Sequence, residues 1–199
     1  NGGGDDFIDG GPGNDTVSYP SLTSTEPVRI DLNEVDRSTD PVVAGILTQA
    51  GLATNTPVGT TTGGAWVGTD VLISIESAAG GAGNDTILGS DEANDVSGAG
   101  GDDSLQGGAG TDRLNGGEGA DILDGGADGD MLIGGSGNDT VFGGLGYDTL
   151  ILSGANTDYT FVSNGGTYTV TDSRAVGDGV DIISSVEQIS FSNITVGLW

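Results

Sequence analysis

A nine-residue period runs through the middle of this chain without interruption. From Gly80 to Ile151 the sequence divides into eight consecutive nonamers, which read GGAGNDTIL, GSDEANDVS, GAGGDDSLQ, GGAGTDRLN, GGEGADILD, GGADGDMLI, GGSGNDTVF and GGLGYDTLI. Position one is always glycine, position six is aspartate in seven nonamers and asparagine in one, and position eight is always aliphatic. Three columns that stay in phase over 72 residues indicate stacked structural repeats and argue against a low-complexity linker.

The nonamer separates into a turn and a short strand. Its glycine-rich first six residues can adopt positive φ and can direct successive carbonyl oxygens toward one point. The last three residues are long enough only for a short strand, whose single inward side chain is the aliphatic residue at position eight. One such unit buries almost nothing by itself, so the units must stack on one another to form a core.

The charge of the chain limits its partners. Thirty acidic residues face four arginines, with no lysine and no histidine, and the formal net charge is −26. Nucleic acids and anionic membranes are therefore poor partners, whereas cations are favoured. No apolar run is long enough to span a membrane. Because only 34% of the residues are apolar and cysteine is absent, a thin core without disulfides needs another source of stability.

The missing residue types also exclude most catalytic chemistry. Without His, Cys or Lys, the chain cannot form an acyl-transfer triad, a histidine-ligated zinc site or a lysine nucleophile. A glycosidase-like carboxylate pair would remain, but no such pair stands out among the aspartates. We therefore predict that this chain is not an enzyme, whatever the activity of its parent protein.

These nonamers resemble the RTX, or haemolysin-type, calcium-binding repeats of secreted bacterial proteins. Two more nonamers at the start of the chain, NGGGDDFID and GGPGNDTVS, extend the match and carry Asp6 and Asp15. The resemblance implies an all-β fold, a parallel β-roll (β-solenoid) with two nonamers in each coil. It also implies Ca²⁺ as cofactor, a parent protein exported by type I secretion machinery, and an extracellular or cell-surface location. Because the chain starts in mid-repeat, we expect it to be a block excised from that parent.

The resemblance further implies where the ions bind. Each ion lies between one turn and the turn two nonamers later, so eight nonamers give six sites. The lower turn supplies its aspartate and the carbonyl oxygens of positions two and four, and the upper turn supplies its aspartate and those of positions one and three. Three sound sites share one edge, and their ligands are Gly81, Gly83, Asp85, Gly98, Gly100 and Asp103; Ala99, Gly101, Asp103, Gly116, Glu118 and Asp121; and Gly117, Gly119, Asp121, Gly134, Ser136 and Asp139.

The other edge is less regular. Its one sound site uses Gly108, Gly110, Asp112, Gly125, Ala127 and Asp130. A weak or empty site pairs Ser90, Glu92 and Asn94 with Gly107, Ala109 and Asp112, and a reduced site places Asp128 beneath Gly143, Leu145 and Asp148. Glu92 replaces a glycine, Asn94 brings no charge, and Asp128 tolerates left-handed backbone geometry better than most residues. We thus predict about four firm sites and two doubtful ones.

Other segments flank the repeats. Residues 1–18 form N-terminal repeats whose calcium binding the sequence leaves open, and residues 19–67 form an irregular insertion. Within the insertion, residues 28–32 alternate like a strand, while residues 41–52 could be a short helix or a buried strand. Residues 68–79 resemble a metal-free coil with Glu76 at position six, so that the β-roll spans residues 68–151. The oligomeric state is left open.

Residues 152–199 form the predicted β-rich cap. Two alternating runs around Asn164, Gly165 and Gly166 predict a hairpin over residues 159–172. Residues 178–196 resemble the strand-rich segment that closes such repeat blocks, and a repeat stack needs a cap over its last coil. The export signal of the family is not evident before Trp199, and the sequence leaves open whether it follows that residue.

Two functions from different classes remain. The first is a calcium-binding module that unfolds through self-repulsion inside the bacterium, folds on external calcium, and acts as a structural and secretion-assisting scaffold. The second is a polysaccharide-binding accessory module, which resemblance to the repeat modules of alginate epimerases allows. That role needs an exposed aromatic or basic face, for which Arg113, Tyr147 and Trp66 are the candidates.

Overall fold

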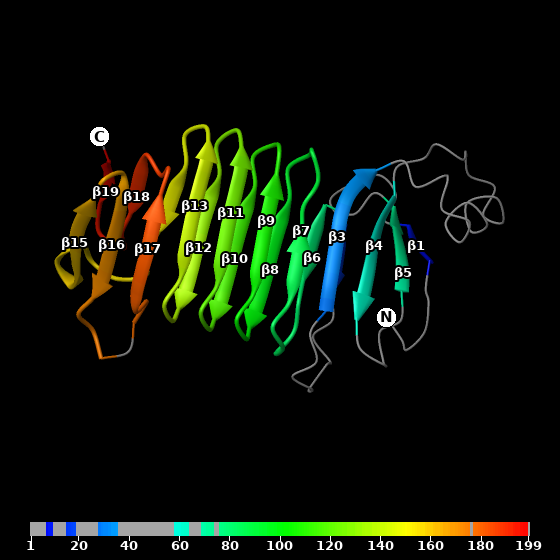
Figure 1. Cartoon of the computed structure of the whole chain (residues 1–199), viewed down its shortest axis with the longest axis horizontal. Helices are drawn as coiled ribbons and strands as arrows, with labels where there is room; N and C mark the ends of the chain where they lie inside the picture. The colour runs from blue at the N-terminus through cyan, green and yellow to red at the C-terminus, as the bar shows by residue number, and fades with distance from the viewer. Residues whose placement is uncertain are drawn as a thin grey trace.

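The chain winds around one axis, and its strands form two β-sheets that lie against each other (Figure 1). A computed structural model describes residues 7–9, 15–18, 28–35, 58–63, 69–73, 76–175 and 177–198. Within these residues the sheets have eleven and eight strands, and between residues 80 and 151 the chain passes from one sheet to the other in every nonamer. The expected all-β, parallel β-solenoid is therefore confirmed, with about 4 coils.

The strands follow the nonamer boundaries. In the repeat region the eleven-stranded sheet holds β7 (Thr86–Leu88), β9 (Ser104–Gly108), β11 (Ile122–Ala127) and β13 (Thr140–Leu145). The eight-stranded sheet holds β8 (Asp95–Gly100), β10 (Arg113–Glu118), β12 (Met131–Ser136) and β14 (Thr149–Ile151). Several strands run on through positions one to three of the next nonamer, so the ordered backbone pairing extends into the turns.

Neighbouring strands pair in parallel at a constant offset of two nonamers. Leu123 lies opposite Leu105 and Val141 in the eleven-stranded sheet, and Leu114 lies opposite Val96 and Leu132 in the other. Equivalent positions of alternate nonamers therefore stack directly on one another. This register aligns the turns at each edge, which is what makes a site between two turns possible.

In the repeat region, the buried apolar residues are the position-eight side chains. All eight of them are at most 1% exposed: Ile87, Val96, Leu105, Leu114, Leu123, Leu132, Val141 and Leu150. Burying one Leu or Ile side chain contributes about 1.5 to 3 kcal/mol. One such residue in nine is a thin core for a chain of this charge, so the turns must be stabilised in some other way.

The N-terminal segments add strands to both sheets. Strand β2 (Thr16–Ser18) pairs in parallel with β6 (Ser77–Ala79), and Val17 faces Ala78 in the core row. Strand β3 (Val28–Val35) confirms the strand expected over residues 28–32 and pairs with β7 and with β4 (Val58–Gly63). Strand β5 (Thr69–Ile73) lies between β4 and β1 (Phe7–Asp9). Residues 41–52 lie outside the described residues.

The C-terminal segments cover the last coil. A short 3₁₀ helix, η1 (Asn156–Asp158), leads into the expected hairpin of β15 (Tyr159–Asn164) and β16 (Thr167–Asp172). Gly165 and Gly166 form its two-residue turn with φ of 65° and 96°, values that favour glycine. Strand β17 (Val180–Ser184) joins this hairpin to β13, and β18 (Gln188–Ser190) and β19 (Thr195–Gly197) extend the other sheet. The strand-rich closing segment is thereby confirmed.

Candidate metal centre

The glycine-rich turns form two columns, one along each side of the roll. The turns that precede the strands of the eleven-stranded sheet, residues 80–85, 98–103, 116–121 and 134–139, form what we call the first edge. The turns that precede the strands of the eight-stranded sheet, residues 89–94, 107–112, 125–130 and 143–148, form the second edge. The parallel register places each turn on the turn two nonamers earlier.

The position-six residues are linked into a ladder along each edge. On the first edge, Oδ1 of Asp121 accepts the backbone N–H of Asp103 at 2.8 Å, and Oδ1 of Asp139 accepts that of Asp121 at 2.9 Å. On the second edge, the Asp112 and Asp130 N–H groups donate to Oδ1 of Asp130 and Asp148 at 2.8 and 2.9 Å. Each carboxylate is thus fixed beside the aspartate of the turn below, at an unchanging interval of 18 residues.

Six of the seven position-six aspartates have a second carboxylate oxygen without a hydrogen-bond partner. Within the described residues this holds for buried Oδ2 atoms of Asp15 and of six repeat aspartates, Asp103, Asp112, Asp121, Asp130, Asp139 and Asp148. Those six residues are at most 3% exposed. A buried polar atom without a partner costs about 1 to 3 kcal/mol, and more when it is charged. Such a column of unsatisfied acceptors calls for a ligand that contributes positive charge.

Backbone carbonyl groups point into the same gaps. A Cβ atom at Gly117 would collide with the carbonyl oxygen of Ala99, and one at Gly119 with that of Gly101, so positions two and four of the lower turn direct their oxygens upward. A Cβ at Gly116 would meet both Oδ2 of Asp121 and the carbonyl oxygen of Gly134, which points down from the turn above. Glycine is therefore required because oxygens from two turns approach the same place.

Side chains alone do not complete such a site. In the described part of the chain, no three acidic side chains lie close enough together to hold a metal ion. Any cation in these gaps must therefore take most of its ligands from the backbone. A set of two carboxylates with several carbonyl oxygens suits Ca²⁺, a hard cation that binds six to eight oxygens in flexible geometry.

Burial and mutual repulsion oppose the charged form of the ladder carboxylates. Burial, together with the charges of Asp85 and Asp121, raises the pKa of Asp103 from 3.8 to about 7, although a hydrogen bond from the Asp85 backbone works in the opposite direction. Burial and the charges of Asp112 and Asp148 likewise raise the pKa of Asp130 to about 7. The folded stack therefore favours protons or a metal ion at these oxygens.

Comparison with known proteins identifies the repeats. The family model of the RTX calcium-binding nonapeptide repeat matches residues 2–18, 75–105, 88–123, 97–132 and 115–150. Residues 2–18 and 75–150 are RTX calcium-binding nonapeptide repeats. Membership of the repeats in this family supports Ca²⁺ as the cation that binds the unsatisfied oxygens of these RTX turns. No curated protein matches the chain.

The structure places backbone oxygens of the predicted ligands on both sides of the gaps between regular RTX turns. The carbonyl oxygens of positions two and four of the lower turn point toward the upper turn, and the position-one carbonyl oxygens of the upper turn point down toward the lower one. The unpaired Oδ2 atoms belong to the same turns. Position-three carbonyls are already engaged, because Glu118 and Ser136 accept the N–H groups of Gly101 and Gly119 at 2.9 Å. A carbonyl oxygen has a second lone pair, so one hydrogen bond leaves it able to bind a cation. The ligand sets and the number of ions stay predictions.

The irregular turns differ from the regular ones in identifiable ways. Asn94 has no spare oxygen, because its Oδ1 accepts the Ser90 N–H at 2.7 Å and its Nδ2 donates to the Glu76 carbonyl at 3.3 Å. Asp128 adopts a left-handed φ of 73°, a geometry that aspartate tolerates better than most residues. Ala99, which the sequence treats as sound, has a φ of 81°. A non-glycine residue is strained there.

Three acidic residues outside the eight nonamers extend the ladders. Oδ1 of Asp181 accepts the Asp139 N–H at 3.0 Å on the first edge, and Oε2 of Glu187 accepts the Asp148 N–H at 2.9 Å on the second. At the opposite end, Glu76 accepts the Asp15 N–H at 2.9 Å. The sequence placed Glu76 at position six but missed Asp181 and Glu187. A signal exists, because each precedes a buried isoleucine, Ile183 or Ile189, by two residues, as position six precedes position eight.

Proposed function

We propose that this chain is a calcium-dependent folding module of a secreted protein, in which ions bound between the RTX turns supply the stability that the thin core lacks. The observation that carries the proposal is the column of buried, unpartnered Oδ2 atoms at position six on both edges. In Asp103, Asp112, Asp121 and Asp130 this atom approaches the same position-one glycine as a carbonyl oxygen of the turn above. A cation at each gap would satisfy both sets of oxygens at once.

Folding and binding are one process in this proposal. Without cations the stacked carboxylates repel one another along the whole edge, and the single aliphatic side chain in each nonamer does not offset that repulsion. With calcium, the free energy of binding becomes free energy of folding, because the gap does not exist in the unfolded chain. Six bound Ca²⁺ ions would also offset 12 of the 26 negative charges in the formal net charge of −26.

The coupling gives the module a role in export. A chain of this charge stays unfolded where calcium is scarce, and an unfolded chain can pass through type I secretion machinery. Extracellular calcium modules bind with Kd values of about 10⁻⁴ to 10⁻³ M, a range in which the external ion switches folding on. We therefore place the module outside the cell or on its surface. In the described residues, no helix is both long and apolar enough to cross a membrane.

Circular dichroism of the full chain tests this function. In chelator at neutral pH the chain should show the spectrum of an unfolded polypeptide, and titration with calcium should produce a cooperative transition to a strand-rich spectrum. Magnesium is the control, because it keeps its waters and demands a smaller octahedral site, and it should not substitute at equal concentration. A strand-rich spectrum that persists in chelator would refute the proposal.

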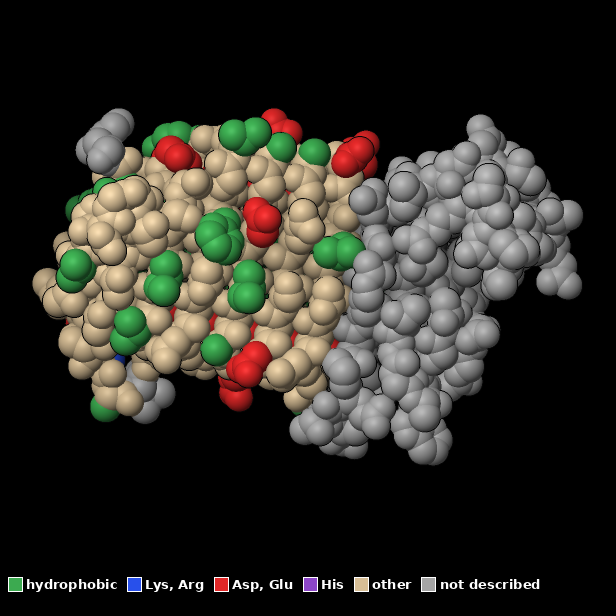
Figure 2. Space-filling view, in the orientation of Figure 1, with side chains coloured by type: hydrophobic (Ala, Val, Ile, Leu, Met, Phe, Trp, Pro, Cys, Tyr) green, Lys and Arg blue, Asp and Glu red, His purple; other side chains and the backbone are tan. Residues whose placement is uncertain are grey.

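The polysaccharide-binding alternative has weaker support. Tyr147 is 58% exposed, but Arg113 is paired with Asp95 at 3.1 Å, and Trp66 lies outside the described residues. The face shown in Figure 2 carries scattered apolar side chains and acidic groups, and no basic patch stands out among its described residues. Binding of the calcium-loaded chain to a polysaccharide array would favour this alternative.

A further inference from the structure

A segment far along the chain adds one more turn to the first edge. After the last nonamer the chain leaves the roll for the β15–β16 hairpin, and residues 177–184 then return beside residues 134–142. Strand β17 pairs in parallel with β13, with Ile183 opposite Val141. Ile183 is fully buried and takes the place of a position-eight residue, although it comes 42 residues later instead of 18.

The returning segment reproduces the contacts of a genuine RTX turn. Asp181 accepts the Asp139 N–H as a position-six aspartate does. Oδ1 of Asn138 accepts the Val180 N–H at 2.9 Å, just as Asn84 accepts the N–H of Asp102 at 2.9 Å three turns below on the first edge. Gly179 bridges in parallel to Gly137 and has a φ of 91°, in the left-handed region where Gly137 also lies. The Gly137 N–H donates to the Asp178 carbonyl at 3.3 Å, as Gly119 donates to Ser136, so residues 178–181 occupy positions three to six. Gly177 departs from the pattern, because a Cβ there would meet the Asp172 carboxylate and not a carbonyl oxygen of the turn below.

The gap beneath this turn contains an unsatisfied oxygen. Asp139 is 1% exposed, and its Oδ2 has no hydrogen-bond partner. This atom has the same relation to Gly134 as Oδ2 of Asp121 has to Gly116, where it faces the turn above. The carbonyl oxygen of Gly137 also points up, since a Cβ at Gly179 would collide with it. Oxygens of the lower turn are thus directed at the returning segment.

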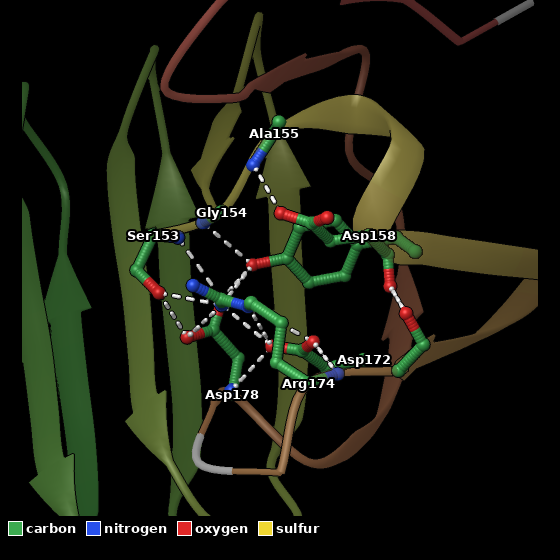
Figure 3. Close-up of polar contacts among 9 residues, drawn as sticks. Ser153, Gly154, Ala155, Asp158, Asp172, Arg174 and Asp178 are labelled. Carbon is green, nitrogen blue, oxygen red and sulfur yellow. Dashed lines mark hydrogen bonds and ion pairs between the residues drawn. The ribbon is translucent and has the colours of Figure 1, made fainter.

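A nearby arginine is already neutralised by other groups. Arg174 forms ion pairs with Asp172 at 2.5 Å and with Asp178 at 3.3 Å. Figure 3 shows these three residues with Ser153 in one polar cluster at the base of the cap. Asp178 also accepts hydrogen bonds from Tyr159 and from Ser153. The carboxylates of Asp139 and Asp181 make no ion pair with this arginine, so their charges remain uncompensated.

We propose that residues 178–181 form the upper half of a seventh calcium site, completed from below by Asp139 and by the carbonyl oxygen of Gly137. The inference rests on the proposed function, because it extends the same coordination to a turn that lies outside the matched repeats. Its consequence is specific to this turn. An ion held there joins the last coil to a segment that follows the hairpin, so calcium also fixes the cap on the roll.

Anomalous diffraction from crystals of the full chain grown with terbium in place of calcium tests the site directly. The expected map has a peak between Asp139 and Asp181 in addition to peaks in the gaps of the repeats. Filled repeat gaps with an empty gap beneath Asp181 would overturn this inference and leave the proposed function standing. A map without peaks in any gap would overturn both.

Counting bound ions in solution gives a second test. Asp181→Asn keeps the oxygen that accepts the Asp139 N–H but removes the charge, and Asp124→Asn removes a charge at position nine as the matched control. Native mass spectrometry in calcium should show one ion fewer for D181N and the wild-type number for D124N. An unchanged number for D181N would overturn the inference. Loss of several ions would show that Asp181 supports the whole roll, and the wild-type terbium map then decides.

Discussion

The backbone N–H of Asp121 donates to Oδ1 of Asp139, which lies one full coil above it, at 2.9 Å. That hydrogen bond uses one carboxylate oxygen of Asp139 and leaves the other buried without a partner. Two aspartates that would repel each other are thus held together by a contact between one backbone and one side chain. In the folded roll this hydrogen bond fixes the carboxylate and leaves its second oxygen for a cation.

Removing one charge from the middle of the first edge should weaken calcium-induced folding. Asp121 belongs to two of the predicted sites, so Asp121→Asn should raise the calcium concentration at the folding midpoint about tenfold, equivalent to about 1.4 kcal/mol. The amide retains an oxygen for the Asp103 N–H. Calcium titration followed by circular dichroism measures the midpoint. D124N is the control, and equal shifts in the two variants would show that only net charge matters.

The raised pKa values predict opposite pH dependence with and without calcium. In the unfolded chain these carboxyls titrate near 3.8, whereas burial raises the pKa of Asp112 to about 6 and that of Asp103 to about 7. Between pH 3.8 and about 7, the folded state therefore binds more protons than the unfolded chain. In chelator, its stability is greatest below 3.8 and is lost as pH rises through 6 to 7.

Calcium should reverse this trend, because the ion competes with protons for the same oxygens and binds more tightly as they deprotonate. Circular dichroism in chelator between about pH 3 and about pH 8 measures the folded fraction without calcium, and urea unfolding in saturating calcium at about pH 5 and about pH 8 measures the stability of the calcium-bound roll. Stability that rises with pH in chelator would contradict the assignment of the raised pKa values to the ladder.

The repeat region was predictable from sequence because all eight nonamers have the same residue types at positions one, six and eight, apart from Asn94, and fold in the same way. Position eight gave the core row from Ile87 to Leu150, and position six gave the two aspartate ladders. The hairpin over residues 159–172 was predictable from local turn chemistry at Gly165 and Gly166. These inferences needed only short-range patterns, repeated or flanked by glycine.

The two ends of the ladders were not predictable in the same way. Asp181 meets Asp139 across 42 residues and Glu187 meets Asp148 across 39, so neither follows the nine-residue period. Their contacts depend on how long the intervening hairpin is and where it returns, which no local pattern specifies. The strain at Ala99 was missed for a different reason: the composition of a turn does not show which positions require positive φ.

Restoring the missing charge at Asn94 should have opposite effects in the two conditions. In calcium just sufficient to fold the wild-type chain, Asn94→Asp should destabilise the roll by about 1 kcal/mol, since the aspartate loses the Nδ2 donor to the Glu76 carbonyl and adds a buried charge. In saturating calcium it should strengthen the site shared with Asp112. Chemical unfolding at the two calcium concentrations measures the two shifts, and a destabilisation of equal size in saturating calcium would show that this gap does not bind the ion.

Truncating one core residue should show how much the thin interior contributes. Leu123 is fully buried, and Leu123→Ala in saturating calcium should cost about 3 kcal/mol through lost burial and a cavity. Met131, which is 43% exposed on the outer face of β12, provides the control, because Met131→Ala removes a side chain that the core does not use. Calcium-dependent urea unfolding compares them, and a small loss for Leu123→Ala would mean that calcium alone stabilises the coil.

Relieving the strain at Ala99 should stabilise the roll without changing any ligand. Ala99 lies at position two with a φ of 81°, where the corresponding residues of the next turns on the first edge, Gly117 and Gly135, are glycines with φ of 115° and 111°. A left-handed alanine costs about 1 to 2 kcal/mol, and the greater flexibility of glycine in the unfolded chain returns part of that. Ala99→Gly should therefore raise the free energy of unfolding in calcium by about 0.5 to 1 kcal/mol. The control is Ala127→Gly at position three, where no positive φ is needed and the same change should destabilise. A loss of stability in both variants would show that Ala99 is not strained in the calcium-bound protein.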